Sequence, residues 1–335
     1  MSSLLRTNSI SAATGSTVTI PSGTTLDISS GATVTGLPAK SNIILNGGFD
    51  IWQRGTSFTS TATNEYSADR FRTEGYGHNT TISRQTFTPS QTDVPNYPTY
   101  FCRIASTSTV SAGEYWGFQQ RVERPQFISG NDTYTLSFWV KSTAPVSAGA
   151  FTFGIASMTA ESSPALTTSW QKVTATATIA SSGSYVSIYI VRLGEGQGNF
   201  TVDIADVQLE IGSVANSFER RNVAEELALC RRYFEKSAPS TSSLIDTSQG
   251  YVNVRDGTAS TLPRYYHRKY SVEKRATPTI TLYDALGATG KVRVDSTNGI
   301  AGVVYGSAST AFNLYASTSI SHYGIFYGWY SDAEL

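Results

Sequence analysis

The chain has 335 residues, with 25 basic and 25 acidic side chains and a formal net charge of zero. Charged residues make up only 15% of the chain, whereas aromatic residues reach 12%. A neutral chain has no overall attraction to nucleic acid, so no nucleic-acid partner is expected. No apolar run is long enough to span a membrane, and the first residues lack the order of an export signal. Membrane insertion and Sec-dependent export are therefore not expected, and Cys102 and Cys230 are too few for a disulfide framework.

The first 40 residues contain a short repeat and no aromatic residue. Residues 18–25 read VTIPSGTT and residues 26–33 read LDISSGAT, so apolar positions align at a spacing of eight. Each copy has the pattern of a minimal strand followed by a Ser-Gly turn. So thin an apolar stripe cannot form a core alone, and repeats of this kind gain a core by stacking on neighbours. Residues 1–40 are predicted to be a β-repeat that organises a parallel homotrimer; a disordered tail is the alternative.

Alternation of apolar and polar residues recurs from Ser41 to Arg221. The clearest segments are residues 134–141, 151–155, 173–179, 185–191 and 200–209. Turn-forming residues separate these segments, and several short strands with such punctuation are typical of a β-sandwich or jelly roll. Residues 41–221 are therefore predicted to form a jelly-roll sandwich. Its predicted core includes Phe138, Val140, Phe153, Ile188 and Ile190.

One short connecting helix is predicted over residues 222–236. Asn222 can cap its start, and the apolar residues of one stripe follow at helical spacing. The members of this stripe are Val223, Leu227, Cys230 and Phe234. Residues 237–335 are predicted to form a small C-terminal β domain, with strands near 251–255, 279–283, 291–295 and 324–330. The predicted fold class is thus all-β with one helix.

Residue patterns that are typical of active sites do not stand out. The histidines, His78, His267 and His322, have no serine elbow or acidic partner at a recognisable spacing. The Gly-rich residues 194–198 lie between predicted strands, so a hairpin turn is expected there instead of a phosphate-binding loop. A pair of carboxylates of the glycosidase type stays open, because spacing in the sequence does not restrict such pairs. The chain is predicted not to be an enzyme.

Several aromatic residues fall on the polar side of their predicted strands. Trp139 alternates with core residues, as does Tyr189 on a later strand. A third strand carries Gln119, Arg121 and Glu123 on one side. An aromatic floor with a polar rim is the arrangement that sugar binding uses. These five residues are predicted to bind glycan on a sheet face; the alternative is that a loop or another chain covers the tryptophan.

The densest basic segment is residues 264–275, where aromatic residues alternate with basic ones. Such interleaving can suit an anionic polymer. A solvated strand edge, which resists pairing with other chains, is the favoured interpretation.

Three stretches of the sequence resemble a known family. They are NIILNGGFDIWQRG at 42–55 with YSADRF at 66–71, VQLEIGSVANSFERR at 207–221 with EELALCRRYF at 225–234, and WYSDAEL at 329–335. The first two are similar to the opening and close of the carbohydrate-binding-module-like jelly roll in tail fibre and appendage proteins of tailed bacteriophages. The last resembles the end of such fibres, and the N-terminal repeat resembles segments of marine and cyanobacterial phage virion proteins.

This resemblance implies a structural calcium ion in the sandwich. Its ligands would come from Gly48 or Asp50 and from Asp206, with Asp203 nearby. Carboxylate and carbonyl oxygens suit such a hard cation. The alternative is that Asp206 only caps a turn.

The resemblance also implies a function. The expected protein is a non-catalytic virion structural protein, a homotrimeric tail fibre or fibre-like appendage that is assembled in the host cytoplasm. Residues 1–40 would attach it to other virion proteins, and its sandwich and C-terminal tip would bind host-surface polysaccharide for adsorption. A capsid decoration or head-fibre protein and a polysaccharide depolymerase are the alternatives.

Overall fold

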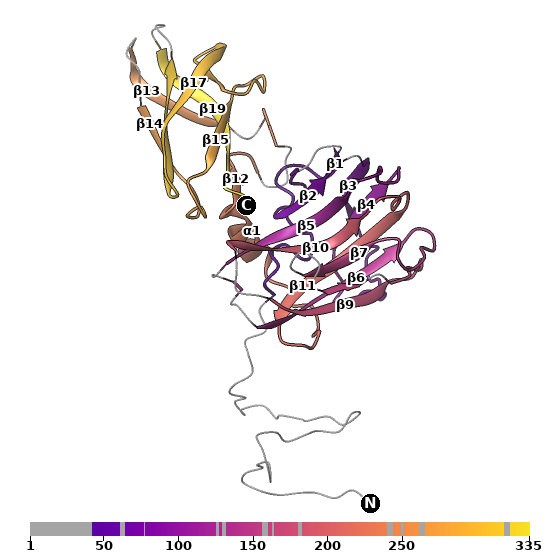
Figure 1. The fold of residues 1–335 in the computed structure, drawn as a ribbon. Coiled ribbons are helices and arrows are strands. Elements are labelled where there is room, and N and C mark those ends of the chain that lie inside the picture. Colours follow the sequence, from indigo (N-terminus) through magenta and orange to yellow (C-terminus); the bar gives the residue numbers. More distant parts are fainter. Residues whose placement is uncertain are drawn as a thin grey trace, which may run out of the picture. The chain divides into compact units, whose positions relative to one another are not determined.

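A computed structural model shows that the chain is nearly all β, with one helix among the residues it describes (Figure 1). The structure describes residues 42–335 except 61–63, 77, 125–126, 129–131, 156–159, 163, 180–182, 240–243, 249–250, 261–264 and 318–321. The predicted all-β fold class is confirmed. The N-terminal β-repeat lies outside the described residues, so its prediction stays untested.

The first sheet has six strands in the order β1-β3-β4-β11-β6-β9. Its strands are β1 Ser57–Ser60, β3 Thr80–Thr86, β4 Tyr100–Ser106, β6 Thr133–Ser142, β9 Gln171–Thr178 and β11 Thr201–Ile211. All neighbouring strands are antiparallel. The opening segment joins this sheet, because the Asn42 side chain donates to the Val207 carbonyl at 2.9 Å and accepts from the Leu209 amide at 3.1 Å.

The second sheet has five strands in the order β2-β5-β10-β7-β8. Its strands are β2 Phe71–Gly75, β5 Trp116–Glu123, β7 Thr152–Ile155, β8 Ala160–Ser162 and β10 Tyr185–Leu193. Side chains from both sheets share one apolar core. The predicted core residues Phe138, Val140, Phe153, Ile188 and Ile190 are all at most 1% exposed, which confirms the alternation from which they were predicted.

The helix α1 covers Val223–Arg231, which is shorter than predicted. Asn222 caps it as expected, since its side chain accepts a hydrogen bond from the Ala224 amide at 2.9 Å. The predicted stripe was wrong at both ends: Val223 is 55% exposed, and Phe234 lies in the strand β12 Phe234–Lys236. The helix ends before Phe234 because the backbone groups of residues 234–236 form hydrogen bonds with the strand β19 His322–Asp332 and not with a further turn of helix. No helix among the described residues has the length and apolar character to span a membrane.

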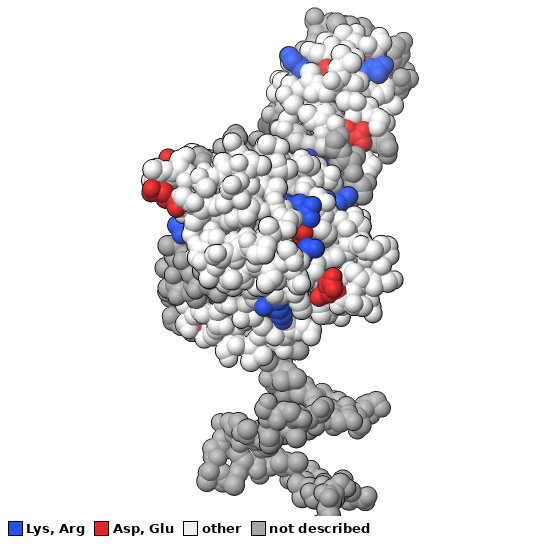
Figure 2. Space-filling model, turned by 90° about the vertical axis from the view of Figure 1, so that its right-hand side faces the viewer, with Lys and Arg blue, Asp and Glu red and all other residues white. Residues whose placement is uncertain are grey.

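A third sheet of eight strands follows the helix. Its strands are β12, β13 Val252–Ser260, β14 Tyr265–Lys269, β15 Thr279–Tyr283, β16 Lys291–Val294, β17 Thr297–Ser307, β18 Ala311–Ser317 and β19 His322–Asp332. The long strand β19 pairs with β12, β13, β15 and β16. Residues 265–269 of the basic segment form β14 at the edge of this sheet, as the favoured interpretation predicts, whereas Lys274 is buried and pairs with Glu235. On the face shown in Figure 2, charged side chains of both signs are few and scattered among the described residues.

Candidate functional site

The predicted glycan-binding residues do not share one face. Trp139 in β6 faces outward from the first sheet, opposite Lys172 of β9. Tyr189 in β10 faces outward from the second sheet, opposite Gln119 of β5. Their neighbours Phe138 and Ile188 point into the core between the two sheets. The expectation of a single site was therefore wrong, because alternation tells which residues avoid the core but not which sheet a strand joins.

Four of the predicted residues lie on the second sheet, and three of them contact a glutamate that the sequence did not single out. Glu74 of β2 accepts hydrogen bonds from the Tyr189 hydroxyl and from Gln119 Nε2, the latter at 2.6 Å. Arg121 Nη2 lies 3.4 Å from Glu74 Oε1, and its guanidinium stacks over the Tyr185 ring at 4.4 Å. Burial is the main cause that raises the pKa of Tyr189, and the hydrogen bond to Glu74 raises it further. The hydroxyl therefore stays protonated and donates to Glu74. These side chains therefore bind one another.

Other parts of the chain also use this face. Glu123 accepts from Arg232 Nη2 at 3.1 Å. The main-chain oxygen of Leu335 accepts from the Tyr66 hydroxyl at 2.7 Å and from Arg72 Nη1 at 3.0 Å. Since its polar groups already hold the protein together, this face is a weaker candidate for a ligand site than the face that carries Trp139.

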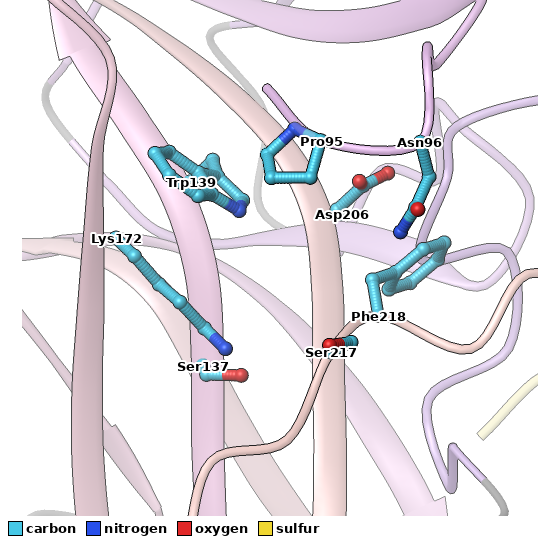
Figure 3. Close-up of a pocket in the computed structure, with 8 residues that line it drawn as sticks. All are labelled: Pro95, Asn96, Ser137, Trp139, Lys172, Asp206, Ser217 and Phe218. Carbon is cyan, nitrogen blue, oxygen red and sulfur yellow. The ribbon is translucent and has the colours of Figure 1, made fainter. Parts of the chain in front are cut away.

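Trp139 lines a cavity of about 190 Å³ on the outer side of the first sheet (Figure 3). The lining residues are Pro95, Asn96, Ser137, Trp139, Lys172, Asp206, Ser217 and Phe218. They come from strands β6, β9 and β11, from the segment before β4 and from the segment after β11. Figure 3 shows the indole and the Lys172 side chain on one side, with the Phe218 ring facing them across the cavity. The cavity thus combines two aromatic walls with polar groups.

A loop covers part of the tryptophan. Trp139 is half-buried and packs with Trp170 against a small apolar cluster. This cluster consists of Phe87, Val94, Phe101 and Ala205, and it is separate from the main core. The alternative in which a loop covers Trp139 therefore holds for one side of the ring, while another side lines the cavity.

Two lining residues have backbone conformations that side chains rarely adopt. Asn96 has φ 63° and Asp206 has φ 51°. The second lies where the register of β11 against β6 shifts between Ala205 and Gln208, which is an irregularity of the bulge type. Bulges redirect side chains, and backbone strain concentrates at functional sites. Here the irregularity places a carboxylate at the cavity.

The structure brings Asp50 and Asp206 to one cation, the guanidinium of Arg220. Arg220 Nη1 lies 3.0 Å from Asp50 Oδ2, and Nη2 lies 3.1 Å from Asp206 Oδ1. Burial raises the pKa of Asp206 to about 7; Arg220 opposes this rise and the charge of Asp50 adds to it. The third candidate, Asp203, binds Arg103 instead at 2.7 Å. Arg220 was missed because its distance in sequence from Asp50 conceals the contact.

The donor set does not fit a calcium ion as it stands. Calcium takes six to eight oxygen ligands in general, whereas the described residues contain no group of three acidic, histidine or cysteine side chains that could hold a metal. Arg220 already pairs with the two carboxylates that the resemblance assigns to the ion. Calcium at this position stays a prediction, and the ion would have to displace Arg220.

A chelator tests whether calcium or the Arg220 guanidinium pairs with Asp50 and Asp206. If calcium displaces Arg220, then adding EDTA to protein purified with calcium should lower its melting temperature, and calcium should restore it. Magnesium serves as the control, because it demands a tighter octahedral shell than these ligands offer. A melting temperature that neither EDTA nor calcium changes would leave Arg220 as the cation of this site.

No protein-family model matches the sequence, and no curated protein matches it. Solved structures show remote likenesses that cover about half of the chain. A cyclase from Fischerella sp. TAU has a TM-score of 0.35 at 13% identity and covers 53% of this chain and 100% of its own. The module TmCBM61, solved with β-1,4-galactotriose, has a TM-score of 0.31 at 16% identity and covers 51% and 99%. Tailspike protein 4 of bacteriophage CBA120 has a TM-score of 0.33 at 12% identity, covering 51% of this chain and 21% of its own. No statement about function follows from likenesses this remote.

Proposed function

We propose that this protein is a non-catalytic glycan-binding protein and that the cavity at Trp139 holds the sugar. The observation that carries the proposal is the combination of Trp139 and Phe218 with Lys172, Asp206 and Asn96 in one cavity. Sugars present apolar C–H faces with a rim of hydroxyl groups, so aromatic walls with polar donors and acceptors complement both parts.

The size of the cavity narrows the proposal. Sites for drug-sized ligands measure about 300–1,000 Å³, whereas this cavity measures about 190 Å³. It therefore suits a single sugar ring, such as a side branch or chain end, better than a long segment of polysaccharide. One such contact is weak, so strong attachment to a surface would require several copies of the site.

Replacing the indole tests the site. We expect Trp139→Ala to weaken binding to the recognised glycan by about tenfold or more, because aromatic anchors at the centre of a site commonly contribute at least that much. A panel of neutral and acidic host-surface polysaccharides, titrated by calorimetry, measures the effect. The matched control is Trp170→Ala, which removes an indole from the same aromatic cluster but not from the cavity lining. Equal binding by wild type and Trp139→Ala would contradict the proposal.

The wider role that we propose is adsorption to host cells by a phage tail fibre or fibre-like appendage. The sequence resemblance and the N-terminal repeat support this role. In this proposal, residues 1–40 join three chains and attach them to other virion proteins. A trimer presents three copies of a weak site, and such linkage raises apparent affinity without new contacts.

The proposed trimer predicts the molar mass of the protein in solution. We expect the full chain to have three times its monomer mass of 36.1 kDa in solution, and a chain that lacks residues 1–40 to be monomeric. Light scattering coupled to size-exclusion chromatography measures both. A full-length chain that is monomeric at micromolar concentration would rule the homotrimer out.

A further inference from the structure

Lys172 differs from the other cations on its face of the first sheet. Arg103 pairs with Asp203, and Lys141 lies 4.0 Å from the same carboxylate. Arg220 is shared by two other carboxylates. Among the described residues Lys172 makes no ion pair, and its ammonium donates only to the main-chain oxygen of Asn216 at 2.6 Å. A lysine ammonium carries three donors, so two remain for a ligand.

The Lys172 ammonium lies where a bound ligand could supply the negative charge with which it pairs. Lys172 is exposed and lines the cavity beside Trp139, which it opposes across the β6–β9 pair. In Figure 3 its nitrogen lies on the Ser137 and Ser217 side of the cavity, and the Asp206 carboxylate lies away from it. A cation at one end of the cavity and a carboxylate at another define two different polar positions for a bound ring.

We propose that the Trp139 cavity binds an acidic sugar residue whose carboxylate pairs with Lys172. This inference rests on the proposed glycan binding and adds the class of sugar. The sugar's ring would pack against the indole, and its hydroxyl groups would donate to Asp206, whose charge Arg220 offsets. The ammonium would donate charge-assisted hydrogen bonds to the carboxylate, so the cavity would favour an acidic ring over a neutral ring of the same shape.

Matched polymers separate the carboxylate from the rest of the sugar. The probes are polygalacturonate, which contains uronic acid, and polysialic acid, which contains a nonulosonic acid. Each is compared with its carboxyl-reduced product by calorimetric titration of the full chain at one ionic strength, because salt screens exposed charges. We expect at least one acidic polymer to bind about threefold to fivefold more tightly than its reduced form, because an exposed ion pair contributes up to about 1 kcal/mol.

Three variants assign this preference to one side chain. Lys172→Gln should lose the preference for the acidic polymer, whereas Lys172→Arg should retain it. Lys141→Gln is the matched control, since Lys141 lies on the same face outside the cavity lining and also contributes one positive charge. Thermal melting verifies that each variant is folded, and Lys172 is exposed, so its replacement should leave the melting temperature unchanged.

The outcomes distinguish this inference from the function on which it rests. Equal affinity for acidic and reduced polymers, or an unchanged preference in Lys172→Gln, overturns the acidic-sugar inference. If Trp139→Ala still weakens binding by about tenfold or more in that case, glycan binding at the cavity stands. An equal loss of preference in Lys141→Gln also overturns the inference, because general electrostatic attraction would then explain it. Failure of the wild type to bind any of the four polymers overturns it as well, and the neutral glycans of the wider panel then decide the proposed function.

Discussion

Phe138→Ala is expected to lower the free energy of unfolding by about 3–5 kcal/mol. The Phe138 side chain is fully buried in the centre of β6, and its ring meets the ring of Phe153 from the facing sheet at 4.8 Å and 76°. Replacement by alanine removes this contact between the sheets. It also leaves a cavity that neighbouring residues, held by two hydrogen-bonded sheets, cannot fill by collapsing.

Urea denaturation followed by tryptophan fluorescence measures this loss. The control is Tyr76→Ala, since Tyr76 is also aromatic but 59% exposed, and a surface replacement should change the free energy by no more than about 0.5 kcal/mol. If Phe138→Ala and Tyr76→Ala had the same small effect, the assignment of Phe138 to the core would be wrong.

The second large effect is expected at Glu334, near the end of the third sheet. Its side chain is 4% exposed and pairs with Arg70, whose side chain is 2% exposed, and with Arg54 at 3.3 Å. The Arg70 guanidinium also lies 3.5 Å from the centre of the Tyr233 ring. Removal of one partner from a buried ion pair leaves a desolvated charge without compensation. Glu334→Ala should therefore destabilise the protein by about 3–5 kcal/mol.

A neighbouring acid provides the matched control for Glu334. Asp332 contacts the same Arg54 at 3.3 Å, but its side chain is 39% exposed. Exposed ion pairs contribute only about 0–1 kcal/mol, so Asp332→Ala should have little effect on the melting temperature. The double variant Arg70→Met with Glu334→Leu should recover part of the loss, because it removes both buried charges. Equal effects of Glu334→Ala and Asp332→Ala would show that burial of Glu334 does not strengthen the pair.

The Glu334 network also explains a difference between sequence and structure. In the sequence, residues 329–335 contain the end of a predicted strand and resemble the ends of fibres. In the structure they contact Arg54 and Arg70 of the opening segment, which are more than 250 positions away. Charge pairs at such separations carry no periodic signal, so the pattern of the sequence could not predict them.

The sequence by itself determined the all-β class, about half of the strands and the core residues such as Phe138 and Ile188. The physical reason is that strand alternation is local: each residue points to the side opposite its neighbour, so polarity alone separates the core from the surface. The cap of the helix at Asn222 is local in the same way.

Only the tertiary structure decided how the outward-facing residues are grouped. It separates Trp139 from Tyr189, because their strands belong to different sheets. It also directs the Tyr189 hydroxyl to Glu74, so this hydroxyl binds within the protein. It also joins Trp139 to Lys172 and Phe218 in one cavity, and it places Arg220 between Asp50 and Asp206. These groupings depend on strand order and on the bulge in β11, and both arise from pairings between distant segments that local alternation does not encode.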